Sequence, residues 1–351
     1  MNTEVKEKVC SIKELHKAMM KCKKGVLWKD SVAKYYAHGL MRCYKLKVKL
    51  MDGSYKICKY INFTIFEPKK REIVSTRFPD RVFQRSLSVN YLTHEVQKDF
   101  IPNNFACQVG KGTHKAIQGF KHCIHNQWTK NGMKIWVLKC DIHDYFGSTS
   151  HLVAKNKTSY IRDEWARNEL YRIIDSFTQG ENHNVGMGLG SEITQSVQLA
   201  VLHPMDIGIT KHFGIVDYIR YMDDFYLFSS DKELLQKCLN YIKEYMRRNG
   251  LTLNEKKTKL MPITQPLHFL GFSFLLKPNG IITMRVLKQK FNKNKRKLKT
   301  LVLKLGLSRE QVNITFTCIL AHMKKSNNRS QIMKMIHYYE SLWKERNNEL
   351  C

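Results

Sequence analysis

The chain has 351 residues, 43% of them hydrophobic, so it is long enough to bury a large core and to form two or three subdomains. The 60 lysines and arginines outnumber the 30 acidic residues and give a formal net charge of +30, which predicts a polyanionic partner such as nucleic acid. No apolar run reaches the length of a membrane span, the first residues lack a secretory pattern, and the ten cysteines include no Cys-x-x-Cys pair, so we expect a cytoplasmic protein with reduced thiols and no membrane partner.

Residues 1–60 are expected to form an N-terminal extension that begins with helices. The segment Tyr44–Leu50 alternates polar and apolar residues and is followed by Asp52-Gly53. This pattern predicts a strand and the turn of a β-hairpin.

A buried strand is predicted over Ile135–Asp141, an apolar run that ends in a carboxylate. A site for two metal ions needs carboxylates from two strands that meet at one point, because a single hairpin tip cannot enclose both ions. Asp141 can supply one of these carboxylates. Asp144 is the rival candidate, but the strand reaches Asp141 first, so Asp144 is expected to cap the strand end.

The most informative segment is 221–224, with the sequence Tyr-Met-Asp-Asp. Apolar runs rich in β-branched and aromatic residues flank it on both sides and predict the two strands of a hairpin, with Asp223 and Asp224 at or beside the turn. Two like charges held together at a tight turn repel each other unless a divalent cation binds them. Together with Asp141, the pair predicts a centre for two divalent ions, which can activate a 3′-hydroxyl and stabilise a pyrophosphate leaving group.

Near the C-terminus, a turn is predicted at Pro278-Asn279-Gly280. The stretch Arg285–Lys304 then carries basic residues and no acid, with apolar residues at roughly helical spacing. This predicts an amphipathic helix with one strongly basic face. Residues 311–347 are expected to form two more helices.

These motifs resemble those of reverse transcriptases, in which a strand followed by Asp-x-x-x-x-aromatic precedes a Tyr-Met-Asp-Asp hairpin. The resemblance implies an α+β fold of the right-hand polymerase type, with fingers and palm built from an antiparallel sheet packed on helices and followed by a helical thumb. It assigns 61–280 to interleaved fingers and palm and 281–351 to a basic thumb. It also implies that Asp141, Asp223 and Asp224 are catalytic and bind two Mg²⁺ ions, with Mn²⁺ as the alternative.

Further segments match the family in chain order. Pro68–Ile73 and Phe78–Gln84 resemble the fingers motifs of bacterial reverse transcriptases. They place Arg71, with Lys70 beside it, at the incoming triphosphate, whose oxygens suit a bidentate guanidinium. Phe146 matches the family's bulky sugar gate, which excludes a ribose 2′-hydroxyl; the alternative is a core aromatic residue.

Two glycine-rich segments are assigned by the same resemblance. Phe105–Lys115 resembles a segment of diversity-generating and related enzymes, and its glycines permit close approach to a nucleic-acid strand that Lys111 would bind. Gly186–Gln195 lies where the family has its template and nucleotide clamp, and it departs from the common pattern because Leu189 replaces a glutamine. Leucine cannot hydrogen-bond the incoming sugar, which predicts lower fidelity. The nucleotide contacts in this clamp are Leu189, Gly190 and Gln195.

The remaining matches lie downstream of the hairpin. Leu251–Thr258 resembles a motif with a lysine near the leaving pyrophosphate, which makes Lys257 a candidate general acid; the alternative is a solvated lysine on a turn. His268–Phe272 resembles the primer grip, a hairpin that holds the primer end. The grip residues are Phe269, Leu270 and Gly271. In the basic thumb helix, the expected template–primer contacts are Lys288, Lys295, Arg296 and Lys299.

The resemblance therefore implies an RNA-directed DNA polymerase that uses dNTPs, an RNA template and a DNA or RNA primer. Three bacterial groups fit so compact a chain: retrons, diversity-generating retroelements and the defence-associated "unknown group". The clamp looks closest to the last, which implies a structured noncoding RNA in antiphage defence, with an accessory protein or a second copy as further partners. Three alternatives stay open: a low-fidelity diversity-generating enzyme, an untemplated or protein-primed DNA polymerase, and a non-catalytic RNA-binding scaffold, although a scaffold has no need of mutually repelling carboxylates.

Overall fold

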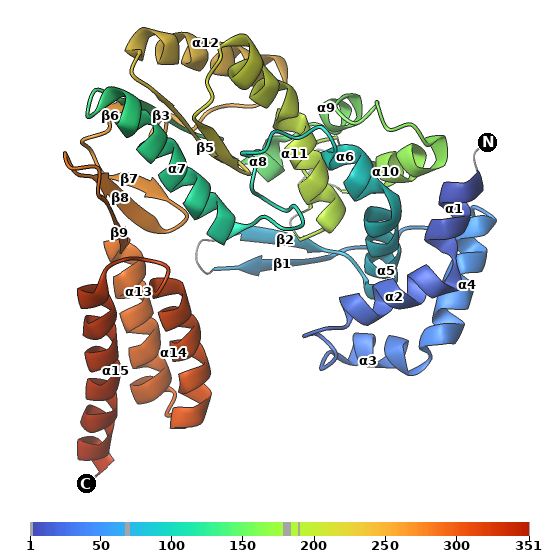
Figure 1. Ribbon diagram of the computed structural model, residues 1–351. Coiled ribbons are helices and arrows are strands. Elements are labelled where there is room, and N and C mark those ends of the chain that lie inside the picture. The colour runs from blue at the N-terminus through green and yellow to red at the C-terminus, as the bar shows by residue number, and fades with distance from the viewer. Residues whose placement is uncertain (1–2, 67–70, 178–183, 189, 351) are drawn as a thin grey trace.

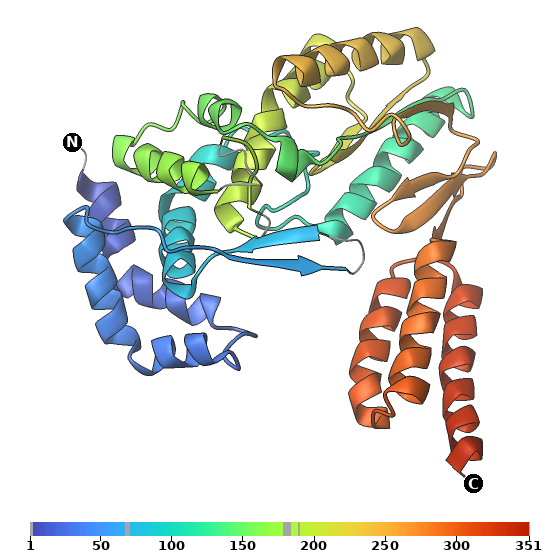
Figure 2. The ribbon, with the colours of Figure 1, turned by 180° about the vertical axis from the view of Figure 1, so that it is seen from behind.

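The protein has an N-terminal helical layer, a central sheet between helices and a C-terminal helical bundle, as Figures 1 and 2 show from opposite sides. This computed structural model describes residues 3–66, 71–177, 184–188 and 190–350. No helix among these residues has the length and apolar character needed to cross a bilayer.

The N-terminal layer consists of helices α1 (Thr3–Cys10), α2 (Ile12–Cys22), α3 (Asp30–Ala37) and α4 (Gly39–Met51). The strand predicted over Tyr44–Leu50 is wrong, because these residues lie in α4. Cys43, Leu46 and Leu50 are spaced three and four residues apart and are all buried on one face of this helix. Tyr44, on another face of the helix, is 53% exposed.

An antiparallel ribbon, β1 (Ile61–Ile65) and β2 (Arg71–Ser75), follows the helices and lies below the central sheet in Figure 1. The chain then forms α5 (Phe78–Leu87), the π-helical segment η1 (Ser88–Leu92) and α6 (Thr93–Gln97). Helix α5 and the segment η1 pack on the N-terminal layer, so the ribbon projects from a helical base.

The central sheet has the strand order β4-β5-β3-β6, and its neighbours are antiparallel. Its strands are β3 (Trp136–Asp141), β4 (Tyr218–Tyr221), β5 (Asp224–Ser229) and β6 (Lys259–Pro262). The predicted strand ending at Asp141 and the predicted hairpin around residues 221–224 are both confirmed.

Helices cover both faces of this sheet (Figure 1). On one face, Leu138 and Leu227 join a buried cluster with α12 (Lys232–Arg248) and α11 (Glu192–Ile207). On the other, Val137 and Phe228 join a second cluster with Phe120 of α7 (Thr113–Asn131). Neighbouring strand residues point to opposite faces, so the nearly continuous apolar runs of β3 and β5 reflect a sheet buried on both sides.

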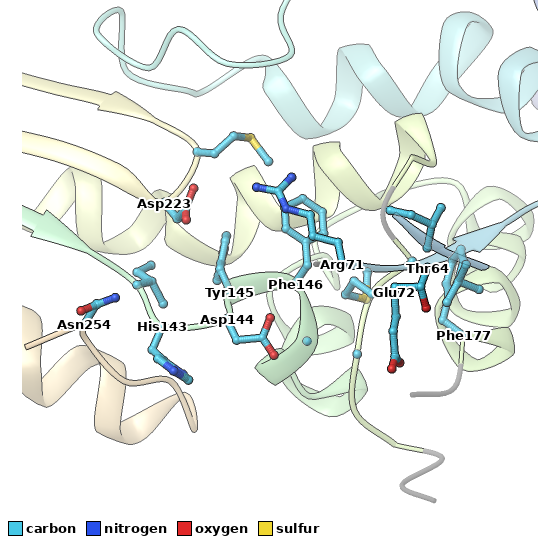
Figure 3. Close-up of a pocket in the computed structure, with 18 of the residues that line it drawn as sticks. Thr64, Arg71, Glu72, His143, Asp144, Tyr145, Phe146, Phe177, Asp223 and Asn254 are labelled. Carbon is cyan, nitrogen blue, oxygen red and sulfur yellow. The ribbon is translucent and has the colours of Figure 1, made fainter. Parts of the chain in front are cut away.

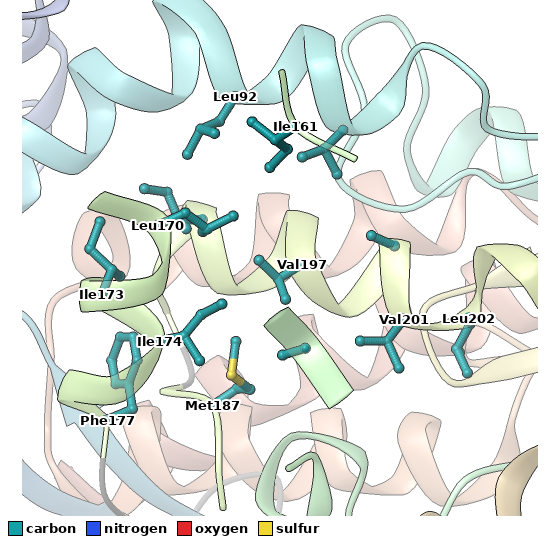
Figure 4. Packing of buried hydrophobic residues seen from close by; sticks show 14 of the residues in the cluster. Leu92, Ile161, Leu170, Ile173, Ile174, Phe177, Met187, Val197, Val201 and Leu202 are labelled. Atoms are coloured by element: carbon teal, nitrogen blue, oxygen red, sulfur yellow. The ribbon is translucent and has the colours of Figure 1, made fainter. Parts of the chain in front are cut away.

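Shorter helices pack around α11. These are α8 (Tyr145–Ser148), α9 (His151–Asn156), α10 (Glu164–Ser176) and the π-helical segment η2 (Gly208–His212). Figure 4 shows Leu170 and Ile174 of α10 in the same buried layer as Val197 and Val201 of α11. This packing fixes the segment before α11, which borders the site described below.

The C-terminal part starts with a three-stranded antiparallel sheet of β7 (Leu267–Phe269), β8 (Phe272–Leu276) and β9 (Ile282–Val286). The helices that follow are α13 (Lys288–Lys299), the π-helical segment η3 (Thr300–Lys304), α14 (Arg309–Met323) and α15 (Arg329–Leu350). The predicted basic helix begins later than expected, because Arg285 belongs to β9. The predicted turn at 278–280 joins β8 to β9, so the small sheet spans the boundary expected at residue 280.

The two further helices predicted over 311–347 are confirmed as α14 and α15. Their Phe316 and Tyr339 rings stack at 3.8 Å. The predicted α+β class, with antiparallel sheets packed on helices and a helical C-terminal part, is also confirmed.

Candidate active site

Three carboxylates meet at one end of the central sheet. Asp141 is the last residue of β3 and pairs in register with Asp224, the first residue of β5. Met222 and Asp223 form the turn between β4 and β5. Met222 has a φ of 57°, which is uncommon for a residue with a side chain and marks local backbone strain at this tip. The sheet register therefore brings together the carboxylates that the sequence had placed on separate segments.

Burial makes this group of charges unfavourable. It raises the pKa of Asp223, and the neighbouring Asp141 charge raises it further. Burial also raises the pKa of Asp224 to about 7, with the charges of Asp141 and Asp223 adding to the shift and Lys139 opposing it. The Asp224 Oδ1 atom is buried and accepts no hydrogen bond, and the Lys139 Nζ atom lies 4.0 Å from it. The three carboxylates therefore repel one another, and one oxygen of Asp224 is left without a hydrogen-bond partner.

Lys257 takes up part of that charge. Its Nζ donates to Asp141 Oδ2 at 2.7 Å, and the backbone N–H of Asn254 donates to the Asp141 carbonyl oxygen at 2.7 Å. The segment predicted to carry a catalytic lysine is thus fastened beside the carboxylates, and one oxygen of Asp141 is occupied by the ammonium group.

Within the described ranges, no group of three or more His, Cys, Asp or Glu side chains is arranged to hold a metal ion. The donor chemistry of Asp141, Asp223 and Asp224 nevertheless fits Mg²⁺. The three offer hard carboxylate oxygens, one buried oxygen of Asp224 has no partner, and their repulsion is relieved by a cation. These three residues would hold the ion, which would compete with Lys257 for Asp141 Oδ2.

We expect the free energy of unfolding of the metal-free protein to depend on pH because of this repulsion. The folded-state pKa of Asp224 lies above its ordinary value of 3.8, so the folded state binds the extra proton and loses stability as the pH rises from about 4 to about 7. Asp224→Asn removes that loss. In urea unfolding with EDTA, the free energy of unfolding of the variant should match that of the wild type below this window and exceed it above the window by on the order of 4 kcal/mol. A constant difference at every pH would contradict the assignment.

A cavity of about 920 Å³ opens from Asp223 and Asp141 towards the β1–β2 ribbon (Figure 3). Arg71 of β2 lines it, and its charge lowers the pKa of Asp223 against the effect of burial, which places the guanidinium near the carboxylates. Phe146 of α8 lines it as well, and its carbonyl oxygen accepts a hydrogen bond from the Met187 N–H at 2.7 Å. The residues predicted for the triphosphate, the sugar and the catalytic charge therefore share one cavity.

The remaining predicted nucleotide contacts are placed only in part. Lys70 and Leu189 lie outside the described residues. Gly190 precedes α11 and has a φ of 104°, a conformation that glycine adopts without strain. Gln195 accepts a hydrogen bond from the Cys107 thiol at 3.2 Å, so in this structure it contacts the loop before α7 and is not among the described residues that line the cavity.

Lys111 differs from its predicted role as a nucleic-acid contact. Its Nζ donates to the carbonyl oxygens of Pro102 and Asn104, at 2.9 and 2.8 Å. Burial lowers its pKa. Its ammonium group therefore braces its own loop in this structure.

The predicted primer grip is the tight turn between β7 and β8. Leu270 and Gly271 have φ values of 49° and 86°. Phe269 is a core residue, whose ring stacks on Phe120 at 4.7 Å. The turn itself, and not the phenylalanine, is therefore the part of this motif that a strand can touch.

Two hydrogen bonds hold this hairpin beside the carboxylates. The hydroxyl group of Tyr226, two residues after Asp224, donates to the carbonyl oxygen of His268. Lys139 Nζ donates to the same oxygen at 3.1 Å. The hairpin is thus fixed to β3 and β5 close to the end where the carboxylates meet.

Two of the thumb lysines predicted to contact the template–primer face α15 instead. Lys295 Nζ lies 4.0 Å from the centre of the Tyr338 ring, and Lys299 Nζ lies 3.8 Å from a carboxylate oxygen of Glu345. Both partners belong to α15, so these lysines help to hold the helical bundle together.

The other two predicted thumb contacts are open to solvent. Lys288 is exposed and lines a second cavity of about 720 Å³, which His268 of the β7–β8 hairpin and Arg285 of β9 also line. Arg296 is exposed. These two have no ion pair or hydrogen bond that ties them to α15 in the described structure.

Sequence analysis missed a buried ion pair that supports the catalytic turn. Arg220 and Asp206 are both fully buried, with Arg220 Nε 2.8 Å from Asp206 Oδ1. The Tyr218 hydroxyl donates to the same oxygen at 2.6 Å. Arg220 Nη1 donates to the Met222 carbonyl oxygen at 3.2 Å, so the pair ties the strained turn to α11. An arginine inside an apolar strand was the available signal, since a buried charge requires a partner.

Comparison with known proteins places these features in context. The sequence profile of a family described as "Reverse transcriptase (RNA-dependent DNA polymerase)" matches residues 67–274. No curated protein matches the chain. Among 418 matching chains of solved structures is telomerase from Candida albicans, in complex with the TWJ fragment of telomeric RNA, at 11% identity and a TM-score of 0.48. The match covers 79% of this chain and 55% of the telomerase chain, so this chain spans about half the length of that relative.

Proposed function

The chain belongs to the reverse transcriptase (RNA-dependent DNA polymerase) family, whose profile matches more than half of it, and we propose that it extends a primer with dNTPs by copying RNA. The fold is that of a right-hand polymerase. One observation carries the proposal: Asp141, Asp223 and Asp224 meet at the end of two paired strands, beside a cavity that also holds Arg71 and Phe146.

We divide the chain for this function as the sequence predicted. Residues 1–60 are the N-terminal extension, 61–280 the fingers and palm, and 281–351 the thumb. In structural terms, the β1–β2 ribbon belongs to the fingers, the central sheet with α7, α11 and α12 forms the palm, and α13–α15 form the thumb.

Two Mg²⁺ ions, or Mn²⁺ in their place, would stabilise the charge on the attacking and leaving oxygens when held by the three aspartates. The chain's own residues perform the other tasks. Arg71 binds phosphate oxygens of the incoming dNTP. Phe146 lies against its sugar. Lys257, whose Nζ already reaches Asp141, is placed to donate a proton to the leaving pyrophosphate.

Phe146→Ala is expected to admit ribonucleotides. Removing the ring leaves room for a 2′-hydroxyl, so the preference for dNTPs over rNTPs should fall by about tenfold to two-hundredfold, the range for a shape-based pocket. Steady-state kcat/KM for a matched dNTP and rNTP pair measures the change. Phe146→Tyr keeps the bulk and should keep the preference. A variant with a lowered Tm and an unchanged preference would make Phe146 a core residue only.

The proposed activity is tested with the full chain purified together with its bound nucleic acid. Incorporation of labelled dNTPs is measured with Mg²⁺ for the wild type and for Asp223→Ala/Asp224→Ala, with and without RNase pretreatment. DNA made by the wild type alone, and lost after RNase, is the expected result. Synthesis that survives RNase would replace the proposal with untemplated or protein-primed polymerisation. RNA binding without synthesis would favour the scaffold.

We further propose that the template is a structured noncoding RNA and that the setting is bacterial antiphage defence, with an accessory protein or a second copy as further partner. The resemblance of the segment from Gly186 to Gln195 to defence-associated enzymes supports this, as does the net charge of +30. Sequencing of the DNA product against the co-purified RNA tests it. Mutated copies of a protein-coding repeat would instead indicate a diversity-generating enzyme.

A further inference from the structure

Helix α4 has two apolar faces, and the fold buries only one of them. Cys43, Leu46 and Leu50 form the buried face, which packs on α1 and α2. The other apolar residues of the helix are exposed and share an arc of about 100° around its axis, at the helical rotation of about 100° per residue. We call this set the outer face of α4, and its members are Leu40, Met41, Tyr44, Val48 and Met51.

The outer face is a continuous patch. Leu40, Tyr44 and Val48 follow one another at four-residue spacing and form a ridge along the helix. Elsewhere, exposed apolar residues such as Leu152 and Ile314 lie on separate elements, α9 and α14. Single exposed apolar side chains are ordinary on a protein surface, whereas a contiguous apolar face indicates a contact with a partner.

A row of basic residues runs beside the outer face. Arg42, Lys45 and Lys49 are exposed and lie next to it around the helix. Asp52, the first residue after α4, turns its carboxylate to the backbone N–H of Ser54 at 2.8 Å. Within the described ranges, no carboxylate forms an ion pair with the three basic residues. The outer face is therefore an apolar ridge bordered by a positive row.

The position of α4 is fixed before a partner arrives. A methyl group added to Gly39 would lie 2.7 Å from Cε of Met19, so the first turn of α4 lies directly against α2. In Figures 1 and 2, α4 lies at the end of the molecule opposite the thumb. A partner on this helix would bind a rigid surface, with little loss of conformational entropy.

Charge decides between the candidate occupants of the outer face. A second copy would bring the same basic row and a formal net charge of +30 against the first, and like charges disfavour this contact. A partner helix with an apolar ridge and a parallel row of Asp or Glu matches both rows at once, since residues three and four apart share one side of a helix. A bilayer surface has no such row in register with a ridge.

We propose that the outer face of α4 docks an acidic amphipathic helix of a partner protein. The inference rests on the accessory protein of the proposed function and assigns a surface to it. The ridge supplies most of the affinity, because docking removes its apolar area from water. The basic row sets the orientation of the bound helix.

The test measures binding of a fluorescent helical peptide to the full chain by anisotropy, with saturating primer–template present to occupy other basic surfaces. The probe is a peptide of about 20 residues with leucines spaced three and four apart and a row of glutamates beside them. Tyr44→Ser/Val48→Ser should weaken binding about tenfold to a hundredfold, since two apolar side chains of the ridge are lost. Tyr44→Leu/Val48→Leu keeps the ridge apolar and should stay within about threefold of wild type.

Three comparisons separate docking from unfolding and from general attraction of charges. Serine has a helix propensity close to those of tyrosine and valine, so the exposed serine variant should keep the Tm of the wild type. Lys45→Gln/Lys49→Gln should weaken binding about threefold to tenfold and reduce its salt dependence. The matched control is Leu152→Ser/Ile314→Ser, which removes two exposed apolar side chains outside the outer face and should leave the affinity unchanged.

Equal affinity of the wild type and the serine variant for the probe would overturn the inference. If the wild type sediments with vesicles of phosphatidylserine and phosphatidylcholine and the serine variant does not, the outer face binds a membrane instead. If sedimentation velocity shows a dimer that the serine variant abolishes, it binds a second copy instead.

The outcome for this inference is separable from that for the proposed function. A wild type that extends the primer and does not bind the probe overturns this inference alone. A wild type that binds the probe through the outer face and makes no DNA overturns the proposed polymerase activity and supports the docking surface.

Discussion

Asp223→Asn is expected to lower the rate of nucleotide incorporation at least about a thousandfold, which corresponds to about 4 kcal/mol of lost transition-state stabilisation. Asparagine keeps the shape of the turn but removes the charge that faces Asp141 and Arg71 across the cavity. Single-turnover incorporation with saturating primer–template isolates this step. Binding of the primer–template should stay within about threefold of wild type, because the basic contacts lie elsewhere.

Asp144→Asn is the matched control, since Asp144 is a carboxylate of the same cavity. Its side chain lies over the start of α8, where an added methyl group on Gly147 would be 2.1 Å from Oδ2. We expect its loss to cost less than about tenfold in rate. An Asp144→Asn variant as inactive as Asp223→Asn would contradict the assignment of Asp141, Asp223 and Asp224 as the catalytic set.

Asp206→Asn is expected to lower the free energy of unfolding by about 3–5 kcal/mol, because it leaves the Arg220 guanidinium buried without its counter-charge. Urea unfolding at neutral pH measures the loss. The same change should loosen the strained turn at Met222, to which Arg220 donates. Under conditions in which the variant stays folded, it should therefore need more Mg²⁺ than the wild type for half-maximal activity.

Glu244→Gln serves as the control for this second prediction. Glu244 pairs with Arg247 and Arg248 on the surface of α12, where solvent screens the interaction, so the unfolding midpoint should stay the same. A further variant, Asp206→Leu/Arg220→Met, removes both charges and should recover much of the stability lost in Asp206→Asn. Equal stability of Asp206→Asn and wild type would show that Arg220 does not depend on this partner.

The candidate site was largely predictable because its signals are local. The strand that ends at Asp141 and the hairpin around Asp223 each have their own apolar pattern. A carboxylate that is the last residue of a buried strand lies at the end of the sheet. The resemblance of two further segments, one before and one after these carboxylates, predicted Arg71 and Lys257 near the same point, and both line the cavity. Only the contacts between these segments had to be supplied by the fold.

The prediction from local pattern was wrong where the period of a strand and the period of a helix both fitted the same residues. In Tyr44–Leu50, a strand and a helix both bury Leu46 and Leu50, and the choice depended on Cys43 and on the neighbouring helices that cover this face. The predicted direction of two basic side chains was wrong for a similar reason. The sequence pattern places Lys295 and Lys299 on a free charged face, but in the structure both contact residues of α15.

The sequence by itself determined which carboxylates lie on strands and at a turn, because short-range periodicity sets these elements, and its composition makes the chain strongly basic. The resemblance of its motifs to those of reverse transcriptases added the α+β polymerase fold. Only the tertiary structure decided how charges are paired. Asp206 of α11 pairs with Arg220 of β4, and Lys111 turns onto its own loop. The partner of a charged side chain is set by long-range packing and burial, and a local pattern carries no record of either.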